Sequence, residues 1–319
     1  MTPVWVVGSG GLLGSAIVRS PLLGKDIRAW QPARQFAWRQ WNTMAQQMRQ
    51  AVTAFGAYAE GAARWEIYWA AGIGTMSTSS EVLVQETRAL EYMLELMSAD
   101  PHLMASSGAF ALSSSAGAVY AGASDEVITE DTPPAPTTAY AREKLAQEQL
   151  MLDFTQRHPQ IRSAAARIST VYGVGKDMSK PQGLLTHIAR SILHRRPVQI
   201  YVPYDTIRDY IAADDAAMAM IAALRCTSGN RPHLTRIVAS ERPTTIAEII
   251  ATFKRVSRRA PRIVTSASQL SALYSKRIQF RSLLPEARPP EAPRSLLIGI
   301  SQLMDAELDA FASPPRPRH

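Results

Sequence analysis

The chain has 319 residues, of which 46% are hydrophobic and 19% are charged. This composition excludes a disordered chain and suits one large domain or two closely joined domains. No uninterrupted apolar run reaches the roughly 18 residues that a membrane span needs, and a single cysteine, Cys226, excludes an internal disulfide. The N-terminal apolar run lacks a preceding basic segment, so we expect no signal peptide and a cytoplasmic protein.

The net charge is +8, which would attract phosphate-bearing molecules. The 29 arginines outnumber the six lysines, but the arginine-rich stretches are short and none interleaves with aromatic residues. Proteins that bind single-stranded nucleic acid combine a basic groove with aromatic side chains, so we expect no nucleic-acid partner. The six histidines show no spacing typical of metal ligands, and we expect no metal.

In the first half of the chain, short apolar runs alternate with helical patterns, which predicts a parallel β-sheet wrapped by helices. The expected strands are 4–8, 26–30, 65–72, 108–115 and 161–169. The expected helices are 12–23, 79–97 and 137–156, and the alanine-rich segment 35–64 is expected to be helical with a weak additional strand. The fold class is therefore α/β, with a Rossmann-type, doubly wound parallel sheet.

The pattern changes near residue 173, where helical stretches are separated by loops and short strands. These stretches are 183–194, 244–258 and 294–311. We expect a Rossmann domain over 1–172 and a smaller α/β region over 173–312, with 205–225 returning to the Rossmann core. Three prolines in the last seven residues predict a flexible tail over 313–319.

The motif GSGGLLG places Gly8, Gly11 and Gly14 directly after the first strand and at the start of a helix. A turn without Cβ atoms lets a pyrophosphate approach the helix N-terminus. We interpret it as the binding turn for NAD(P), and the alternative is a tight turn that holds no ligand.

No carboxylate lies between Arg28 and Ala45, although sites that prefer NAD usually carry an acid at the end of the second strand. That position falls near Gln31, which Arg28 and Arg34 flank. These arginines favour NADP slightly over NAD because a guanidinium suits a 2′-phosphate, unless they are ordinary surface residues.

Two Tyr-x-x-x-Lys patterns occur, at Tyr140 with Lys144 and at Tyr172 with Lys176. The first lies in a predicted helix, so both side chains share a face, and the ammonium would lower the pKa of the phenol towards that of a usable base. Two glycines interrupt the second pattern and remove the shared face. Upstream, LSSSAGAVYAG puts three serines at the carboxyl end of a predicted strand, where such sheets bind ligands.

Six motifs in order resemble the extended short-chain dehydrogenase/reductases of the nucleotide-sugar epimerase/dehydratase type. They are GSGGLLG, YWAAG, LSSSAGAVYAG, ITEDTPPAPTTAYAREK, RISTVYGVG and DTIRDYIAADDAAMA. The stretch SLLIGISQLM resembles the closing helix of that family, so the resemblance covers nearly the whole chain.

The resemblance implies catalysis by Ser115, Tyr140 and Lys144, with Ser114 as the alternative hydroxyl. The residues that it implies for cofactor binding are Gly8, Gly11, Leu12, Leu13, Gly14, Gln31, Arg34, Ala70, Ala71, Gly72, Ser113, Tyr140 and Lys144. Those that it implies for substrate binding are Ser115, Ala116, Tyr140, Thr170, Tyr172 and Arg208. Arg208 would bind the diphosphate, and the alternative for it is a surface salt bridge with Asp209 or Asp215.

Three positions depart from the family pattern. Thr170 stands where asparagine usually precedes VYG, Glu86 replaces the usual asparagine of the helix after YWAAG, and no acid is recognisable near WRQWN. Ala116 and Gly117 follow the catalytic hydroxyl where dehydratases carry Asp-Glu, which disfavours dehydration.

The expected function is oxidoreduction at a sugar carbon of a nucleoside-diphosphate sugar. A C4-type epimerase in surface-polysaccharide precursor synthesis is the first expectation, and an NADPH-dependent 4-keto-sugar reductase is the alternative. A binding protein that has lost turnover is a further alternative. The resemblance also implies a homodimer through 79–97 and 137–156.

Overall fold

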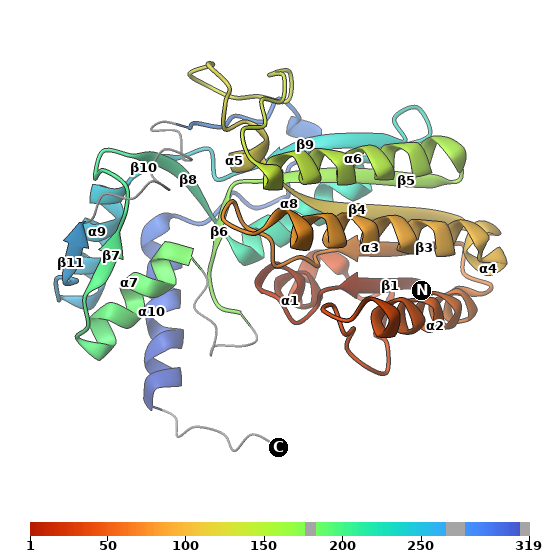
Figure 1. The fold of residues 1–319 in the computed structure, drawn as a ribbon, viewed down its shortest axis with the longest axis horizontal. Helices are drawn as coiled ribbons and strands as arrows, with labels where there is room; N and C mark the ends of the chain where they lie inside the picture. The colour runs from red at the N-terminus through yellow and green to blue at the C-terminus, as the bar shows by residue number, and fades with distance from the viewer. Residues whose placement is uncertain (176–182, 266–277, 313–319) are drawn as a thin grey trace.

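A six-stranded, fully parallel sheet forms the centre of the computed structural model, which describes residues 1–175, 183–265 and 278–312 (Figure 1). Its strands, in spatial order, are β2 (Ile27–Trp30), β1 (Thr2–Val7), β3 (Arg64–Trp69), β4 (Ser107–Ser115), β5 (Ile161–Ile168) and β9 (His233–Val238). The predicted Rossmann-type α/β fold is confirmed.

Helices cover both faces of this sheet because its strands carry apolar side chains on both sides. In β1, Val4 and Val6 pack towards α1 (Leu12–Arg19) and α8 (Ala213–Cys226). Trp5 and Val7 pack towards the opposite layer. That layer contains α2 (Trp41–Ala59), α3 (Ser80–Ala99), α4 (Pro101–Met104) and α6 (Ala139–Arg157). None of the described helices is long and apolar enough to cross a membrane.

The additional strand predicted within 35–64 is wrong, because α2 occupies most of that segment. Its buried residues recur at helical spacing, from Met44 and Met48 to Phe55 and Ala59. β2 is consequently an edge strand among the described residues.

The helix predicted over 12–23 ends early. α1 stops at Arg19, and a 3₁₀ turn, η1 (Pro21–Leu23), follows Ser20. Pro21 has no N–H with which to continue the helical hydrogen bonds, and its ring disfavours the helical conformation for Ser20.

A smaller lobe lies beside the carboxyl end of the sheet (Figure 1). Its helices are α7 (Gly183–His194), α9 (Ile246–Ser257) and α10 (Leu296–Ala312), which share one hydrophobic core. Its strands are β6 (Thr170–Tyr172), β8 (Ile207–Ala212) and β10 (Pro243–Thr245) in one sheet, and β7 (Val198–Ile200) and β11 (Ile263–Thr265) in another. The segment 205–225 connects the two parts, since β8 pairs with β6 while α8 packs on β4, β5 and β9. The tail predicted over 313–319 lies outside the described residues.

The start of α9 corrects the helix predicted over 244–258. A short strand, β10, precedes it, and α9 begins at Ile246 behind a capping box. The hydroxyl of Thr245 accepts from the backbone N–H of Glu248, whose carboxylate accepts from the backbone N–H of Thr245. This arrangement satisfies two backbone donors at the helix start.

Candidate active site

The turn after β1 contains glycines at positions where two backbone segments approach each other closely. Gly8 has φ +85°, and a Cβ there would lie 2.7 Å from the backbone nitrogen of Ala71. A Cβ on Gly14 would lie 2.2 Å from the carbonyl oxygen of Gly8. Gly8 therefore brings the turn against Ala70 and Ala71 of the segment after β3, and Gly14 lets α1 pack directly against Gly8.

No side chain caps the backbone N–H groups at the N-terminus of α1, which follows this turn. Gly11 occupies the N-cap position, makes no capping hydrogen bond, and no acidic residue stands in the first turn. The free N–H groups and the helix dipole suit the negative charge of a pyrophosphate. The predicted residues Leu12, Leu13 and Gly14 form this first turn, so these residues fit the phosphates of a dinucleotide.

Near the end of β2, the Ser9 hydroxyl donates to Gln31 Oε1 at 2.9 Å, which links the glycine turn to the predicted ribose position. Arg28 is directed elsewhere, because its guanidinium donates to the carbonyl of Tyr58 at 2.7 Å and lies over that ring. Of the two arginines considered for a 2′-phosphate, Arg28 is partly buried, whereas Arg34, three residues after Gln31, is exposed.

The three serines at the end of β4 alternate between the two sides of the strand. Ser114 is buried, and its hydroxyl donates to Glu148 Oε1 at 2.5 Å. Ser113 and Ser115 are partly exposed on the other side, and the Ser115 hydroxyl lies close enough to the Tyr140 phenol to lower its pKa. Ser114 and Ser115 thus point to opposite sides of the strand, and Ser115, its last residue, is the one close to the phenol.

Tyr140 lies in the first turn of α6. That helix starts at Ala139 because the Thr138 hydroxyl accepts a hydrogen bond from the backbone N–H of Ala141 at 3.2 Å. Capping by Thr138 therefore sets the position at which the phenol meets Ser115.

Lys144 follows one turn later and is buried. Its Nζ donates to Gln147 Oε1 at 3.0 Å and to the carbonyl of Ser113 at 3.4 Å. It also lies 5.8 Å from the centre of the Tyr140 ring. Lys144 is thus held beneath the tyrosine, on the face that both residues share.

Burial raises the pKa of Tyr140 to about 12, and the carboxylate of Glu86 adds to the rise, whereas the hydrogen bond to Ser115 lowers it. Burial lowers the pKa of Lys144, while the carboxylates of Glu86 and Glu148 act in the opposite direction. The phenol is therefore a proton donor at neutral pH, and its use as a base requires additional positive charge beside it.

Two further residues of α6 belong to the arrangement and were not predicted. Gln147 and Glu148 lie seven and eight residues after Tyr140, so they continue the same helix face. Glu148 forms a buried ion pair with Arg167 of β5, with 2.7 Å between Oε2 and Nη2. Only the spacing from Tyr140 offered a sequence signal for them.

The predicted substrate residues are distributed over two lobes. Ala116 is fully buried at the start of α5 (Ala116–Val119), and Thr170 is exposed in β6. The Tyr172 hydroxyl lies against α10, because a Cβ on Gly299 would be 1.9 Å from it. Arg208 is partly buried in β8 and donates to the carbonyl of Ile207 at 2.9 Å.

The aspartate after Arg208 has a structural role. Asp209 is buried and accepts hydrogen bonds from the hydroxyls of Ser169 and Ser240 and from the backbone of Ser240 and Arg242. Burial raises its pKa, and these hydrogen bonds oppose the rise. Asp209 therefore fastens the loop after β9 to β8, and Arg208 follows directly from that fixed position.

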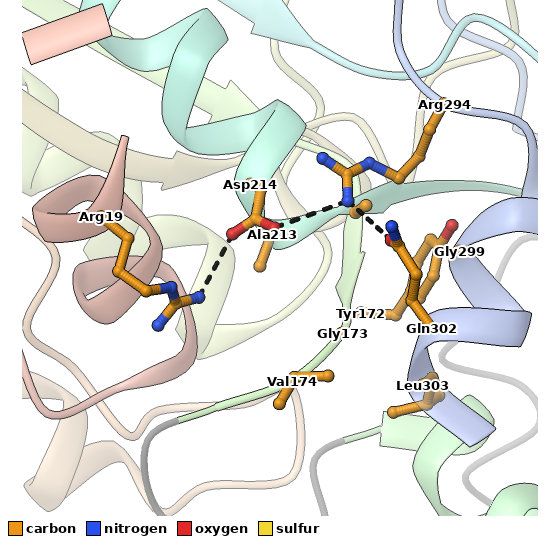
Figure 2. Close-up of a pocket in the computed structure, with 11 residues that line it drawn as sticks. Arg19, Tyr172, Gly173, Val174, Ala213, Asp214, Arg294, Gly299, Gln302 and Leu303 are labelled. Atoms are coloured by element: carbon orange, nitrogen blue, oxygen red, sulfur yellow. Dashed lines mark hydrogen bonds and ion pairs between the residues drawn. The ribbon is translucent and has the colours of Figure 1, made fainter. Parts of the chain in front are cut away.

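A crevice of about 430 Å³ separates the Rossmann core from the smaller lobe (Figure 2). Asp214, in the first turn of α8, accepts from Arg19 at 3.2 Å and from Arg294 at 3.5 Å. Arg294 also donates to Gln302 of α10 at 2.7 Å and to Asp215 at 3.0 Å. These ion pairs link the Rossmann core to the smaller lobe across the crevice.

Within the described ranges, no group of three or more His, Cys, Asp or Glu side chains is placed to hold a metal ion. Lys176, of the second Tyr-x-x-x-Lys pattern, lies outside those ranges.

Solved structures share this fold over nearly its whole length. MoeE5 in complex with UDP-glucuronic acid and NAD has a TM-score of 0.76 and 18% identity, covering 97% of this chain and 100% of that chain. The UDP-glucose 4-epimerase of Thermotoga maritima with UDP-glucose has a TM-score of 0.75 and 16% identity, covering 97% and 100%. The Thermus thermophilus UDP-glucose 4-epimerase with NAD has a TM-score of 0.75 and 20% identity, covering 95% and 98%.

Sequence comparison adds one curated protein and one family. The dTDP-4-dehydro-6-deoxyglucose reductase of Escherichia coli is 32% identical over 111 residues, which are 35% of this chain and only 34% of that protein. The sequence pattern of the NAD dependent epimerase/dehydratase family matches residues 4–237, well over half of the chain. With this match and the shared fold, the chain belongs to the NAD dependent epimerase/dehydratase family.

Proposed function

We propose that this protein catalyses NAD(P)-dependent oxidoreduction at a sugar carbon of a nucleoside-diphosphate sugar. The observation that carries the proposal is that Ser115 lies close to the Tyr140 phenol, with Lys144 buried on the helix face that carries Tyr140. Proteins of the same fold bind UDP-glucose or UDP-glucuronic acid together with NAD or are named as UDP-glucose epimerases. The homodimer through α3 and α6 remains part of the proposal.

The chemistry follows from the three side chains. The nicotinamide, when bound, accepts a hydride from the sugar carbon or returns it. Tyr140 takes the proton of the sugar hydroxyl as that carbon becomes a ketone, and it gives the proton back when the ketone is reduced. Ser115 donates a hydrogen bond to the same oxygen, and the Lys144 ammonium stabilises the phenolate.

A C4-type epimerase is the first form of this proposal. The sugar hydroxyl is oxidised to a 4-keto group, the sugar turns in the pocket, and the hydride returns to the opposite face, so the cofactor is regenerated without net change. Such an enzyme would supply surface-polysaccharide precursors. Arg208, held by the fixed position of Asp209, would bind the diphosphate with its guanidinium.

A 4-keto-sugar reductase is the second form. Two observations favour it: the identity shared with a dTDP-4-dehydro-6-deoxyglucose reductase over part of the chain, and Gln31 in place of an acid at the end of β2. Arg34 beside Gln31 would suit the extra phosphate of NADP. In this form Tyr140 only donates a proton, NADPH is consumed, and the product leaves.

Incubation of the purified protein with nucleoside-diphosphate sugars distinguishes these forms. An epimerase converts UDP-glucose or UDP-N-acetylglucosamine into its C4 epimer, detected by chromatography, without net change in the absorbance of reduced nicotinamide. A reductase oxidises NADPH in step with loss of a 4-keto-sugar nucleotide. Cofactor binding without turnover of either substrate class would contradict both and support the non-catalytic alternative.

A further inference from the structure

One carboxylate beside the catalytic pair has no role in the steps above. Glu86 lies in the second turn of α3, and its Oε1 accepts hydrogen bonds from the backbone N–H groups of Ile73 at 2.7 Å and Gly74 at 2.9 Å. A single carboxylate oxygen therefore holds two consecutive amides of the β3–α3 loop. Hydrogen bonds to a charged acceptor are stronger than those between neutral groups.

The second oxygen of Glu86 faces the place where this loop meets Tyr140. A Cβ on Gly72 would lie 3.2 Å from Oε2, and a Cβ on Gly74 would lie 3.1 Å from Oε2 and 3.4 Å from Cδ2 of Tyr140. Gly72 has φ +143°, a conformation that only glycine adopts without strain. The loop is thus clamped between the Glu86 carboxylate and the tyrosine ring.

Neighbouring side chains extend this contact from α3 to the lysine. Thr87 Oγ1 donates to Glu143 Oε2 at 2.6 Å and accepts from Gln147 Nε2 at 3.2 Å. Gln147 in turn accepts from Lys144. The two helices are therefore locked together by polar contacts at the level of the catalytic pair.

We propose that Glu86 is a positioning residue of the active site, which fixes the 72–74 backbone against Tyr140 and keeps a negative charge beside the Tyr140 and Lys144 pair. This inference rests on the proposed function for its kinetic consequence only. The loop contact and the charge belong to the protein alone, so they can be tested without turnover.

The charged and polar groups that face the pair come from three elements. Glu86 comes from α3, Ser115 from β4, and Lys144 with Glu148 from α6. Glu86 disfavours the phenolate and favours the ammonium, so it stabilises the state in which the phenol carries a proton for delivery to a ketone oxygen. Glu86 therefore adapts the site to the reductive step.

Three variants separate positioning from charge. Glu86→Gln keeps an amide oxygen for the two loop N–H groups but removes the charge. Glu86→Ala removes both. Glu91→Gln removes the same charge from an exposed position of α3 and is the matched control.

Hydrogen exchange of the 70–78 peptide, read by mass spectrometry, reports the loop contact. We expect faster exchange by about tenfold or more in Glu86→Ala, because two amides lose their acceptor, and near-parent exchange in Glu86→Gln and Glu91→Gln. Unchanged exchange in Glu86→Ala would overturn the positioning role.

A rapid jump to about pH 11, followed by tyrosinate absorbance before the protein unfolds, reports the charge. In each variant, the part of the absorbance change that is lost when Tyr140→Phe is also introduced is due to ionisation of Tyr140. We expect this amplitude to rise by about 2.5-fold or more in Glu86→Gln, which corresponds to a fall of half a pKa unit from about 12, and to stay unchanged in Glu91→Gln. Equal amplitudes in the parent and Glu86→Gln would overturn the charge role, whether or not any sugar nucleotide is turned over.

Where turnover is found, the pH profile of kcat/KM supplies the kinetic readout. The limb that reports Tyr140 should move to lower pH in Glu86→Gln and stay in place in Glu91→Gln. An unmoved limb together with the expected absorbance change would contradict the assignment of Tyr140 to that limb, and so the proposed function, while leaving the role of Glu86 intact.

Discussion

The Ser114 hydroxyl donates to Glu148 at 2.5 Å, on the side of β4 that faces α6. This hydrogen bond ties the end of the strand to the helix that carries Tyr140 and Lys144. The next residue, Ser115, points to the opposite side of the strand and lies close to the phenol.

Replacing each serine in turn by alanine should therefore distinguish an effect on kcat from an effect on the free energy of unfolding. Ser115→Ala removes the hydrogen bond to the substrate oxygen, and we expect kcat to fall by about 10²-fold or more with little change in unfolding temperature. Ser114→Ala leaves kcat closer to the parent value but lowers the free energy of unfolding by about 1–2 kcal/mol, because Glu148 loses a buried donor. Steady-state kinetics and thermal unfolding of both variants make the comparison. The reverse pattern would assign the catalytic hydroxyl to Ser114.

Removing only one partner of the buried ion pair between Glu148 and Arg167 should destabilise the fold strongly. Glu148→Ala leaves the guanidinium buried and reduces the free energy of unfolding by about 3–5 kcal/mol. Glu286→Ala, which breaks an exposed ion pair with Arg231, should cost less than about 1 kcal/mol. Urea unfolding gives both values, and a similar small cost for the two variants would contradict a structural role for the buried pair.

Cofactor binding should depend on the missing Cβ at Gly14. In Gly14→Ala the new methyl group would collide with the Gly8 carbonyl, so the turn must open. We expect the dissociation constant for NAD or NADP to rise by about tenfold or more, equivalent to about 1.4 kcal/mol. Gly229→Ala, where a Cβ meets nothing within 4 Å, is the control. Calorimetric titration that gives equal affinity for the two variants would argue against the turn as the pyrophosphate site.

Alkaline pH should destabilise the fold through Tyr172. Burial raises the pKa of Tyr172 to about 12, above the value of about 10 in an unfolded chain. Between these values the unfolded chain releases a proton that the folded protein retains, so the free energy of unfolding falls as the pH rises. Tyr172→Phe should make this decline shallower, by on the order of 2 kcal/mol across the window.

The matched control for this experiment is Tyr204→Phe, at an exposed position. Its decline should equal that of the parent in urea unfolding at each pH. If Tyr172→Phe and Tyr204→Phe gave the same slope, the inter-lobe position of the Tyr172 hydroxyl would not be the cause.

Local patterns predicted the sheet, the glycine turn and the Tyr140 and Lys144 pair, because each depends on spacing within a few residues. The partners of the pair were not predictable in the same way. A glutamate in a helix is usually exposed, and the burial of Glu148 depends on its ion pair with Arg167 of β5. Arg28 was likewise predicted as a phosphate ligand, but its guanidinium donates to the carbonyl of Tyr58 in α2. Contacts between segments distant in sequence decide these cases.

The role of Tyr140 as the acid and base is tested by single-turnover hydride transfer in the parent protein and in Tyr140→Phe. The protein is mixed with nicotinamide cofactor and a sugar nucleotide that the parent converts, and the absorbance of reduced nicotinamide is followed. We expect a rate lower by about 10²–10⁴-fold in Tyr140→Phe, with cofactor affinity within a few-fold of the parent. A rate within a few-fold of the parent would contradict the assignment of Tyr140 as the acid and base of the reaction.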